Sequence, residues 1–304
     1  MKAKNNRTIE LTESEKEYYS KKFLHPNDIN SENCYNSTIC SNVFDAINKI
    51  PNNSIDLLIT DPPYNMTKEF GRSDFKKIKD VEYRNWMSFW FSKVLKKLKS
   101  NASIYICSDW KTSPIVYSVL KYYKLNIQNR ITWEREKGRG SKYNWKNSSE
   151  DIWFATVSDD YYFNVDAVKM KRKVKAPYKE NGEPKDWKVE SNGNYRLTHP
   201  SNFWSDISVP FWSMPENTNH PTQKSEKLIA KLILASSIEN DTILDPFVGS
   251  GTTSVVAKKF NRNYIGVELD NYYCCITEKR LYQTNFDKSI QGFKDNVFWE
   301  RNSK

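Results

Sequence analysis

The sequence is poor in cysteine and histidine, the residues that most often bind transition metals. Its 304 residues include five cysteines, an odd number, and contain no Cys-x-x-Cys pair. This argues against a disulfide framework and against a zinc site, and it indicates a reducing compartment. The only histidines are His25, His199 and His220, so a histidine-rich metal centre is disfavoured as well. We therefore expect no metal site.

Long apolar runs are also missing. No stretch approaches the roughly 18 residues that a membrane-spanning helix needs, and the N-terminus is too polar for a signal peptide. These absences predict a cytoplasmic protein. The chain is long enough for one large or two modest domains with a sizeable core.

Positive charge and aromatic rings are abundant. Lysine and arginine total 47 against 37 aspartate and glutamate, which gives a net charge of +10. Such an excess favours polyanionic partners, nucleic acid first, although solubility alone also explains it. The 10 Trp, 18 Tyr and 15 Phe residues add surfaces on which bases stack, but most of these rings must pack in the core.

Helical and strand patterns alternate along the chain. Helices are predicted near 43–47, 86–98, 115–123, 226–238, 251–260 and 272–282, with Trp86 and Trp90 as core residues. Strands are predicted at 55–59, 103–107, 127–133, 151–156, 242–245 and 264–268. This alternation predicts an α/β fold with a doubly wound, mostly parallel sheet.

The remaining segments lack this regularity. Residues 1–36 are polar and predict an arm or a lid, and residues 283–304 form a tail with little signal. Residues 159–219 interrupt the alternation and hold the densest basic run, 169–175. An irregular segment of this length is usually functional, so we expect a recognition element inserted between the two halves, 37–158 and 220–282. The basic run itself is equally consistent with a DNA contact and with a solvated face.

The stretch Asp61-Pro62-Pro63-Tyr64 follows the strand predicted at 55–59. Prolines supply no backbone donors and keep the chain extended. Their carbonyls and the Asp61 carboxylate therefore form a cluster of acceptors beside the Tyr64 ring. Such a cluster suits a planar molecule with an exocyclic amino group, such as a nucleobase. Taken alone, Pro-Pro-Tyr is more often a loop or a ligand for small domains.

A second informative stretch, 244–253, has the sequence Leu-Asp-Pro-Phe-Val-Gly-Ser-Gly-Thr-Thr and connects a predicted strand to a helix. Gly249 and Gly251 permit a tight turn and a close approach of a ligand to the backbone. Glu268 ends the next predicted strand, where an acidic residue accepts hydrogen bonds from ribose hydroxyls. The pattern predicts a nucleoside site, and the missing third glycine disfavours NAD.

These two stretches, with His220-Pro221-Thr222-Gln223-Lys224 before the second, resemble the DNA amino-methyltransferases that use S-adenosylmethionine. The catalytic element precedes the cofactor element, as in the permuted group called beta. The resemblance covers about residues 39–282. It implies a Rossmann-like, doubly wound, mostly parallel seven-stranded sheet in which 37–158 is the catalytic half, 159–219 the target-recognition region and 220–282 the cofactor-binding half. It also implies S-adenosyl-L-methionine as cofactor and double-stranded DNA as partner, and leaves open a homodimer and a cognate restriction endonuclease.

The resemblance assigns roles to particular residues. The flipped target base would be held by Asp61, Pro62, Pro63 and Tyr64. Cofactor contacts would come from Asn42, Asp61, Thr222, Lys224, Asp245, Phe247, Gly249, Gly251, Thr252 and Glu268. DNA contacts would come from Lys137, Arg139, Lys169, Lys171, Arg172 and Lys173.

Two positions depart from the family pattern. Ser41-Asn42 stands where the family usually has Gly-Asp against the adenine of the cofactor, although an Asn amide still hydrogen-bonds adenine. Ser225 stands where the family usually has proline after the lysine. Serine is a good helix N-cap, so we expect little effect.

The reaction that this resemblance implies needs no covalent intermediate with the enzyme. Asp61 and the Pro62 carbonyl would accept both amino hydrogens of the base, which makes its nitrogen a better nucleophile toward the sulfonium methyl. Cys40 and Cys107 are accordingly expected in the core. Members with Asp at the first motif position usually methylate adenine N6, and those with Ser cytosine N4, so we expect adenine N6. The alternatives are cytosine-N4 methylation and a non-catalytic DNA-binding or partner subunit that keeps the fold.

Overall fold

The computed structural model describes residues 4–70, 73–135, 140, 142–174, 179–184, 186–191 and 193–300. The α-helices are α1 (Glu13–Tyr19), α2 (Val43–Ala46), α3 (Asp80–Leu95), α4 (Ser113–Tyr122), α5 (Glu226–Ser236), α6 (Thr252–Lys259) and α7 (Asn271–Gln283). Short 3-10 helices are η1 (Pro26–Asp28), η2 (Ile47–Lys49) and η3 (Val165–Val168). None of the helices in these ranges has the length and apolarity needed to cross a membrane.

The strands fall into one large sheet and several small ones. The large sheet contains β1 (Ser37–Cys40), β2 (Ile55–Thr60), β5 (Leu98–Ser108), β6 (Asn126–Glu134), β7 (Ser149–Thr156), β13 (Phe203–Trp204), β14 (Thr242–Asp245) and β15 (Asn263–Glu268). A second sheet contains β8 (Met170–Lys173), β11 (Lys188–Glu190), β12 (Gly193–Thr198), β16 (Phe293–Lys294) and β17 (Val297–Trp299). Two hairpins are β3 (Lys68–Phe70) with β4 (Ser73–Phe75), and β9 (Lys179–Glu180) with β10 (Glu183–Pro184).

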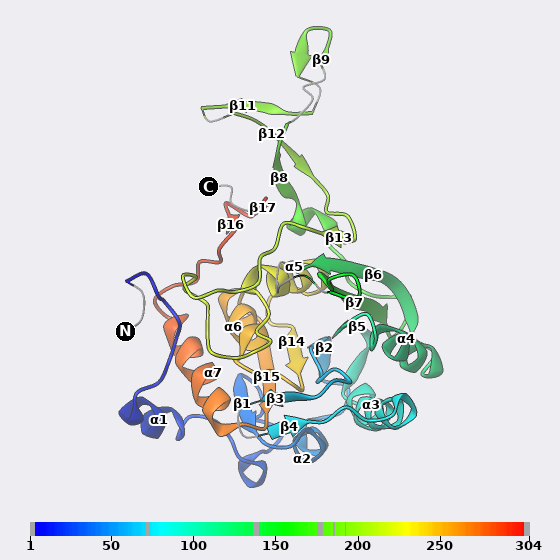
Figure 1. The fold of residues 1–304 in the computed structure, drawn as a ribbon, viewed down its shortest axis with the longest axis vertical. Coiled ribbons are helices and arrows are strands. Elements are labelled where there is room, and N and C mark those ends of the chain that lie inside the picture. The colour runs from blue at the N-terminus through cyan, green and yellow to red at the C-terminus, as the bar shows by residue number, and fades with distance from the viewer. Residues whose placement is uncertain are drawn as a thin grey trace.

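The large sheet is doubly wound and mostly parallel, as predicted (Figure 1). Its order is β1-β15-β14-β2-β5-β7-β6-β13. The first five strands in this order are parallel to one another, and β7 runs antiparallel to both its neighbours, β5 and β6. The described residues give eight strands rather than seven, because the two-residue β13 joins the edge beside β6. The order of the strands reverses between β14 and β2, and a crevice forms at such a switch point.

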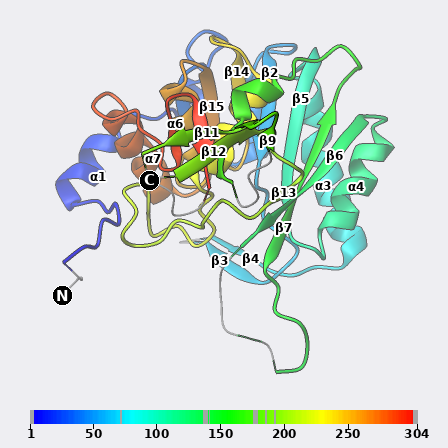
Figure 2. The same ribbon diagram turned by 90° about the horizontal axis from the view of Figure 1, so that it is seen from above.

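Helices cover both faces of this sheet, with α6 and α7 on one side and α3 and α4 on the other (Figure 2). Because side chains alternate along a strand, Leu57 and Ile59 of β2 pack with α5 and α6, whereas Leu58 packs with α3 and α4. Trp90 lies fully buried in the latter core, as expected, and Trp86 packs partly buried against it. The two apolar layers hold the ends of β2 and β14 in place.

The polar N-terminal segment contains more structure than its composition indicates. Strand β1 pairs parallel with β15; its sequence Ser-Thr-Ile-Cys is too short and too polar to predict a strand. Helix α1 begins with a capping box between Thr12 and Glu15 and packs Tyr19 against α7. Ile9 forms a β-bridge with Thr218, so this segment also contacts the loop that precedes α5.

The second sheet combines the basic run with the C-terminal tail. Its order is β11-β12-β8-β17-β16, and it extends away from the main body of the molecule (Figure 1). Strand β8 carries the basic run between antiparallel β12 and parallel β17. The ammonium of Lys171 lies 4.4 Å from the ring centroid of Trp299 on β17, so a residue of the tail packs directly on the run.

A buried ion cluster connects this second sheet to α5. Lys231 of α5 is 1% exposed, and its Nζ lies 2.9 Å from both carboxylate oxygens of Asp206. Lys227 Nζ also lies 2.8 Å from Asp206 and donates to the carbonyl of Trp299. Burial lowers the pKa of Lys231 to about 8. One carboxylate therefore pairs with two buried lysines at the junction.

Removing this carboxylate tests whether the junction stabilises the protein. Asp206→Ala leaves both lysines buried without their counter-ion, and breaking a buried ion pair in this way costs about 3–5 kcal/mol of unfolding free energy. We expect a loss of that size in chemical denaturation. Glu32→Ala, at an exposed position, is the control and should change stability little. A loss below about 1 kcal/mol for Asp206→Ala would contradict a structural role for the cluster.

Candidate active site

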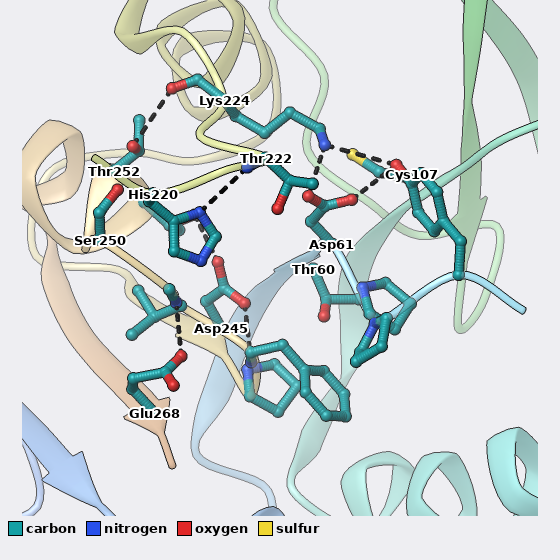
Figure 3. Close-up of a pocket in the computed structure, with 18 of the residues that line it drawn as sticks. Thr60, Asp61, Cys107, His220, Thr222, Lys224, Asp245, Ser250, Thr252 and Glu268 are labelled. Atoms are coloured by element: carbon teal, nitrogen blue, oxygen red, sulfur yellow. Dashed lines mark hydrogen bonds and ion pairs between the residues drawn. The ribbon is translucent and has the colours of Figure 1, made fainter. Parts of the chain in front are cut away.

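A cavity of about 320 Å³ opens at the carboxyl ends of β2 and β14 (Figure 3). Both sequence stretches singled out above line it, although they are far apart in the chain. The predicted site residues that line the cavity are Asn42, Asp61, Pro62, Pro63, Tyr64, Thr222, Lys224, Asp245, Phe247, Gly249, Thr252 and Glu268. A cavity of this size accommodates a small-molecule ligand.

The tetrapeptide after β2 is held in one conformation by hydrogen bonds. The hydroxyl of Tyr64 donates to Asp61 Oδ1 at 2.6 Å, and the hydroxyl of Tyr83 donates to the Pro63 carbonyl at 2.8 Å. Asn65 donates to the Ile78 carbonyl at 3.0 Å and so secures the following residues. Burial and the Asp61 carboxylate raise the pKa of Tyr64 well above its usual value, which keeps the hydroxyl a donor. Asp61 is thus oriented toward the cavity by a neutral tyrosine.

Lys224 contacts Asp61 directly. Its Nζ forms an ion pair with Asp61 Oδ2, lies 3.2 Å from Glu150 Oε2, and sits 5.6 Å from the centroid of the Tyr64 ring. Burial opposes the charge, but the carboxylates of Asp61 and Glu150 outweigh it and raise the pKa of Lys224. The resemblance assigns this lysine to the cofactor contacts; in this structure it connects the segment before α5 to the tetrapeptide that follows β2.

The two glycines of the second stretch have left-handed backbones. Gly249 has φ +56° and Gly251 has φ +83°. A Cβ at Gly249 would lie 2.9 Å from His220 Nε2, and one at Gly251 would lie 2.5 Å from Thr277 Cγ2. Gly251 is the N-cap of α6 and does not itself line the cavity. Its role is to shape the loop, since any side chain there would be strained and would clash.

Two carboxyls hold this loop, that of the buried Asp245 and that of the partly buried Glu268. Asp245 accepts from the Phe247 amide at 3.1 Å and from Thr253 Oγ1 at 2.6 Å. Glu268 accepts from the Gly249 amide at 3.0 Å. Burial raises the pKa of Asp245 and that of Glu268 to about 7 each. Both predicted cofactor residues therefore also shape the loop that they adjoin.

The wall between the two stretches is aromatic. The ring centroids of Phe247 and Trp86 lie 5.9 Å apart, and those of Phe247 and Trp90 lie 5.1 Å apart. Trp86, predicted only as a core residue, also lines the cavity. Asn42 is exposed to the cavity from the other side, and its Oδ1 caps α2 by accepting from the Phe44 amide at 3.0 Å.

The predicted DNA-binding residues that the structure describes, Lys169, Lys171, Arg172 and Lys173, do not line the cavity. Lys137 and Arg139 fall outside the residues that the structure describes. Lys169 pairs with Asp166 at 2.7 Å, and Lys171 pairs with Glu190 at 2.6 Å. Arg172 and Lys173 lie beside them on β8, with Lys173 exposed.

Two charged residues at the site, Arg280 and Glu150, were not predicted from the sequence. Arg280 of α7 donates to the Ser250 carbonyl at 2.7 Å and so holds the glycine loop. Glu150, at the start of β7, is 2% exposed, lines the cavity and pairs with Arg135. A glutamate at the start of a buried, apolar strand indicates a functional charged residue. The sequence does not show which cavity that residue lines, because this depends on the order of the strands in the sheet.

Comparison with known proteins identifies the family. The family described as DNA methylase, which groups N6 and N4 methyltransferases, matches residues 55–279. The chain is 33% identical over 260 residues to the type II methyltransferase M.HpaI of Haemophilus parainfluenzae, covering 84% of this chain and 75% of that protein. It is 33% identical over 244 residues to the DNA adenine methyltransferase YhdJ of Escherichia coli K12, covering 77% and 79%.

Solved structures share the fold. The cytosine-N4-specific PvuII DNA methyltransferase aligns with a TM-score of 0.61 at 16% identity, over 83% of this chain and 88% of that one. The complex of M1.HpyAVI with S-adenosylmethionine aligns with a TM-score of 0.55 at 22% identity, over 80% and 98%. The matched residues 55–279 include both stretches that line the cavity. The chain therefore belongs to the DNA methylase family of N6 and N4 methyltransferases.

Proposed function

We propose that this chain transfers a methyl group from S-adenosyl-L-methionine to N6 of an adenine flipped out of double-stranded DNA. The observation that carries the proposal is that Asp61 and Tyr64 share one cavity with the glycine loop after β14. Two further facts support adenine: Asp stands at the first motif position, and the relative YhdJ is a DNA adenine methyltransferase. Cytosine N4 is the alternative substrate atom.

The cofactor half of the cavity suits this cofactor. Bound there, the cofactor supplies a methyl group on a positively charged sulfur. Glu268 at the end of β15 would accept the ribose hydroxyls, and Gly249, where the His220 ring leaves no room for a Cβ, would shape the loop that lines the cofactor site. Phe247 and Trp86 would provide an apolar wall, and Asn42 would hydrogen-bond the adenine ring. Thr222, Lys224, Asp245 and Thr252 complete the lining of the proposed cofactor site, and Gly251 shapes its loop.

The catalytic half would activate the target amino group. Asp61 and the Pro62 carbonyl would each accept one amino hydrogen, which draws the nitrogen lone pair out of conjugation with the ring. The Tyr64 ring offers a stacking face, and such stacking is worth about 1–3 kcal/mol per base. That energy offsets part of the few kcal/mol needed to extrude a base from the duplex.

The second sheet is the proposed site of target recognition. It extends from the body and presents Arg172 and Lys173 on β8. Lysine and arginine contacts to phosphates position a protein on DNA without specifying sequence. Lys137 and Arg139 remain predicted DNA contacts, and a homodimer and a cognate restriction endonuclease remain predictions from the resemblance.

Replacing Asp61 tests the catalytic half. Asp61→Asn keeps the size of the side chain but removes the carboxylate, so we expect methyl transfer to fall by at least about a hundredfold, as when one catalytic hydrogen-bonding group is removed from an active site. Cofactor affinity, measured by calorimetry, should change far less. The exposed Asp45→Asn is the control. Normal turnover of Asp61→Asn would remove this carboxylate from the mechanism.

Replacing Gly251 tests the cofactor loop. Gly251→Val forces a β-branched residue into a left-handed backbone against Thr277, so the cofactor dissociation constant should rise at least about tenfold, as expected for strain of roughly 1–2 kcal/mol or more. Gly182→Val is the matched control, because Gly182 also has a positive φ but no atom within 4 Å of its added Cβ. Equal cofactor affinity in wild type and Gly251→Val would refute the loop assignment.

The methylated base itself distinguishes the two substrate atoms. DNA treated with the purified protein and cofactor, digested to nucleosides and separated, should contain N6-methyladenine. N4-methylcytosine without N6-methyladenine would assign the chain to cytosine, whereas neither product would support a non-catalytic role.

A further inference from the structure

Four charged side chains from four separate segments meet beside the cavity. Asp61 follows β2, Lys224 precedes α5, Glu150 begins β7, and Arg135 follows β6. Lys224 pairs with Asp61 and Glu150, and Arg135 pairs with Glu150. All four line the same cavity. The cluster has two positive and two negative charges, so its net charge is zero, as a buried group of charges requires.

Glu150 occupies the middle of this cluster. It is 2% exposed, with Oε1 bound by the Arg135 guanidinium and Oε2 3.2 Å from Lys224 Nζ. Among the described residues, no group donates an aligned hydrogen bond to Oε2. A buried carboxylate oxygen with only a charge contact is costly, so its position needs a reason. That reason is the ammonium group opposite it.

Lys224 is consequently shared between two carboxylates. An ammonium held by Asp61 alone would withdraw electron density from the oxygens that have to accept the amino hydrogens of the base. The negative charge of Glu150, 3.2 Å from the same ammonium, offsets that effect. In the buried cluster these interactions are screened little by solvent.

We propose that Glu150 is a positioning residue for Asp61 that acts through Lys224. Its negative charge compensates part of the charge of the Lys224 ammonium, which stays in contact with Asp61, and so leaves the Asp61 carboxylate a better acceptor for the target amino group. This inference rests on the proposed methyl transfer, because Asp61 is the acceptor in that reaction. Glu150 itself does not need to touch the base.

A purely structural role for Glu150 would act through Arg135 instead. The Arg135 amide donates to the Ser148 carbonyl at 2.6 Å, so Arg135 and Glu150 together close the base of the loop between β6 and β7. In that case Arg135→Met would reproduce the effects of Glu150→Gln. A positioning role for Glu150 therefore depends on Lys224, whereas a purely structural role depends on Arg135.

A double-mutant cycle with Lys224 separates these roles. Single-turnover methyl transfer is measured at saturating cofactor for wild type, Glu150→Gln, Lys224→Met and the double variant. We expect Glu150→Gln to lower the rate at least about tenfold in the wild-type background, but less than about threefold when Lys224 is methionine, since contacting residues couple strongly. Equal loss in both backgrounds, or no loss in the first, would overturn the proposal.

Two further variants keep the test decisive if Lys224→Met turns over too slowly to measure. Glu150→Asp retains the charge opposite Lys224 and should remain within about fivefold of wild type, whereas Arg135→Met should not reproduce the loss seen for Glu150→Gln. An Asp variant as slow as the Gln variant, or an Arg135 variant that matches it, would contradict the proposal.

Controls separate this inference from the proposed function. Glu278→Gln replaces a carboxyl on α7 whose pKa is also raised by burial but which does not line the cavity, and it should leave the rate unchanged. Melting temperatures show whether each variant folds. Absence of transfer by the wild type would refute the proposed function; an active wild type with an unaffected Glu150→Gln would refute only the role of Glu150.

Discussion

The parallel pairing of β14 with β2 is the interaction on which the site depends. Leu244 is paired with Leu58 and Ile243 with Leu57, so the two strands end at the same edge of the sheet. Asp245 is the last residue of β14, and Asp61 directly follows β2. Because the strand order reverses at this point, the loops after these strands separate and leave a crevice between them. The tetrapeptide and the glycine loop face each other for this reason.

Buried charge then connects these loops. Lys224 joins the segment before α5 to Asp61, and Arg280 joins α7 to the glycine loop through the Ser250 carbonyl. Buried ion pairs contribute little net stability compared with apolar packing, but losing one partner is costly. These ion pairs therefore serve to position the loops rather than to stabilise the fold. They hold acceptors and donors at the rim of a cavity whose floor is formed by the apolar ends of the strands.

Much of this could be predicted from local sequence. The alternation of helices and strands predicts the doubly wound sheet, and the acceptor cluster at Asp61 and the turn at Gly249 are visible as short motifs. Features that depend on distant pairing were not predictable. Strand β1 has too few apolar residues to predict a strand, and the tail becomes a strand only because β17 pairs with β8. Lys171 belongs to a basic run, yet its pairing with Glu190 depends on the register of the second sheet. Glu150 likewise acquires its neighbours from sheet order alone.

We propose that one crevice brings the methyl donor and the target amino group together. A crystal structure of the protein with bound S-adenosyl-L-methionine tests it most directly. We expect the ribose against Glu268, the sulfur beside the glycine loop, and the methyl group pointing across the cavity toward Asp61. A cofactor bound elsewhere, or one whose methyl group faces away from Asp61, would contradict it.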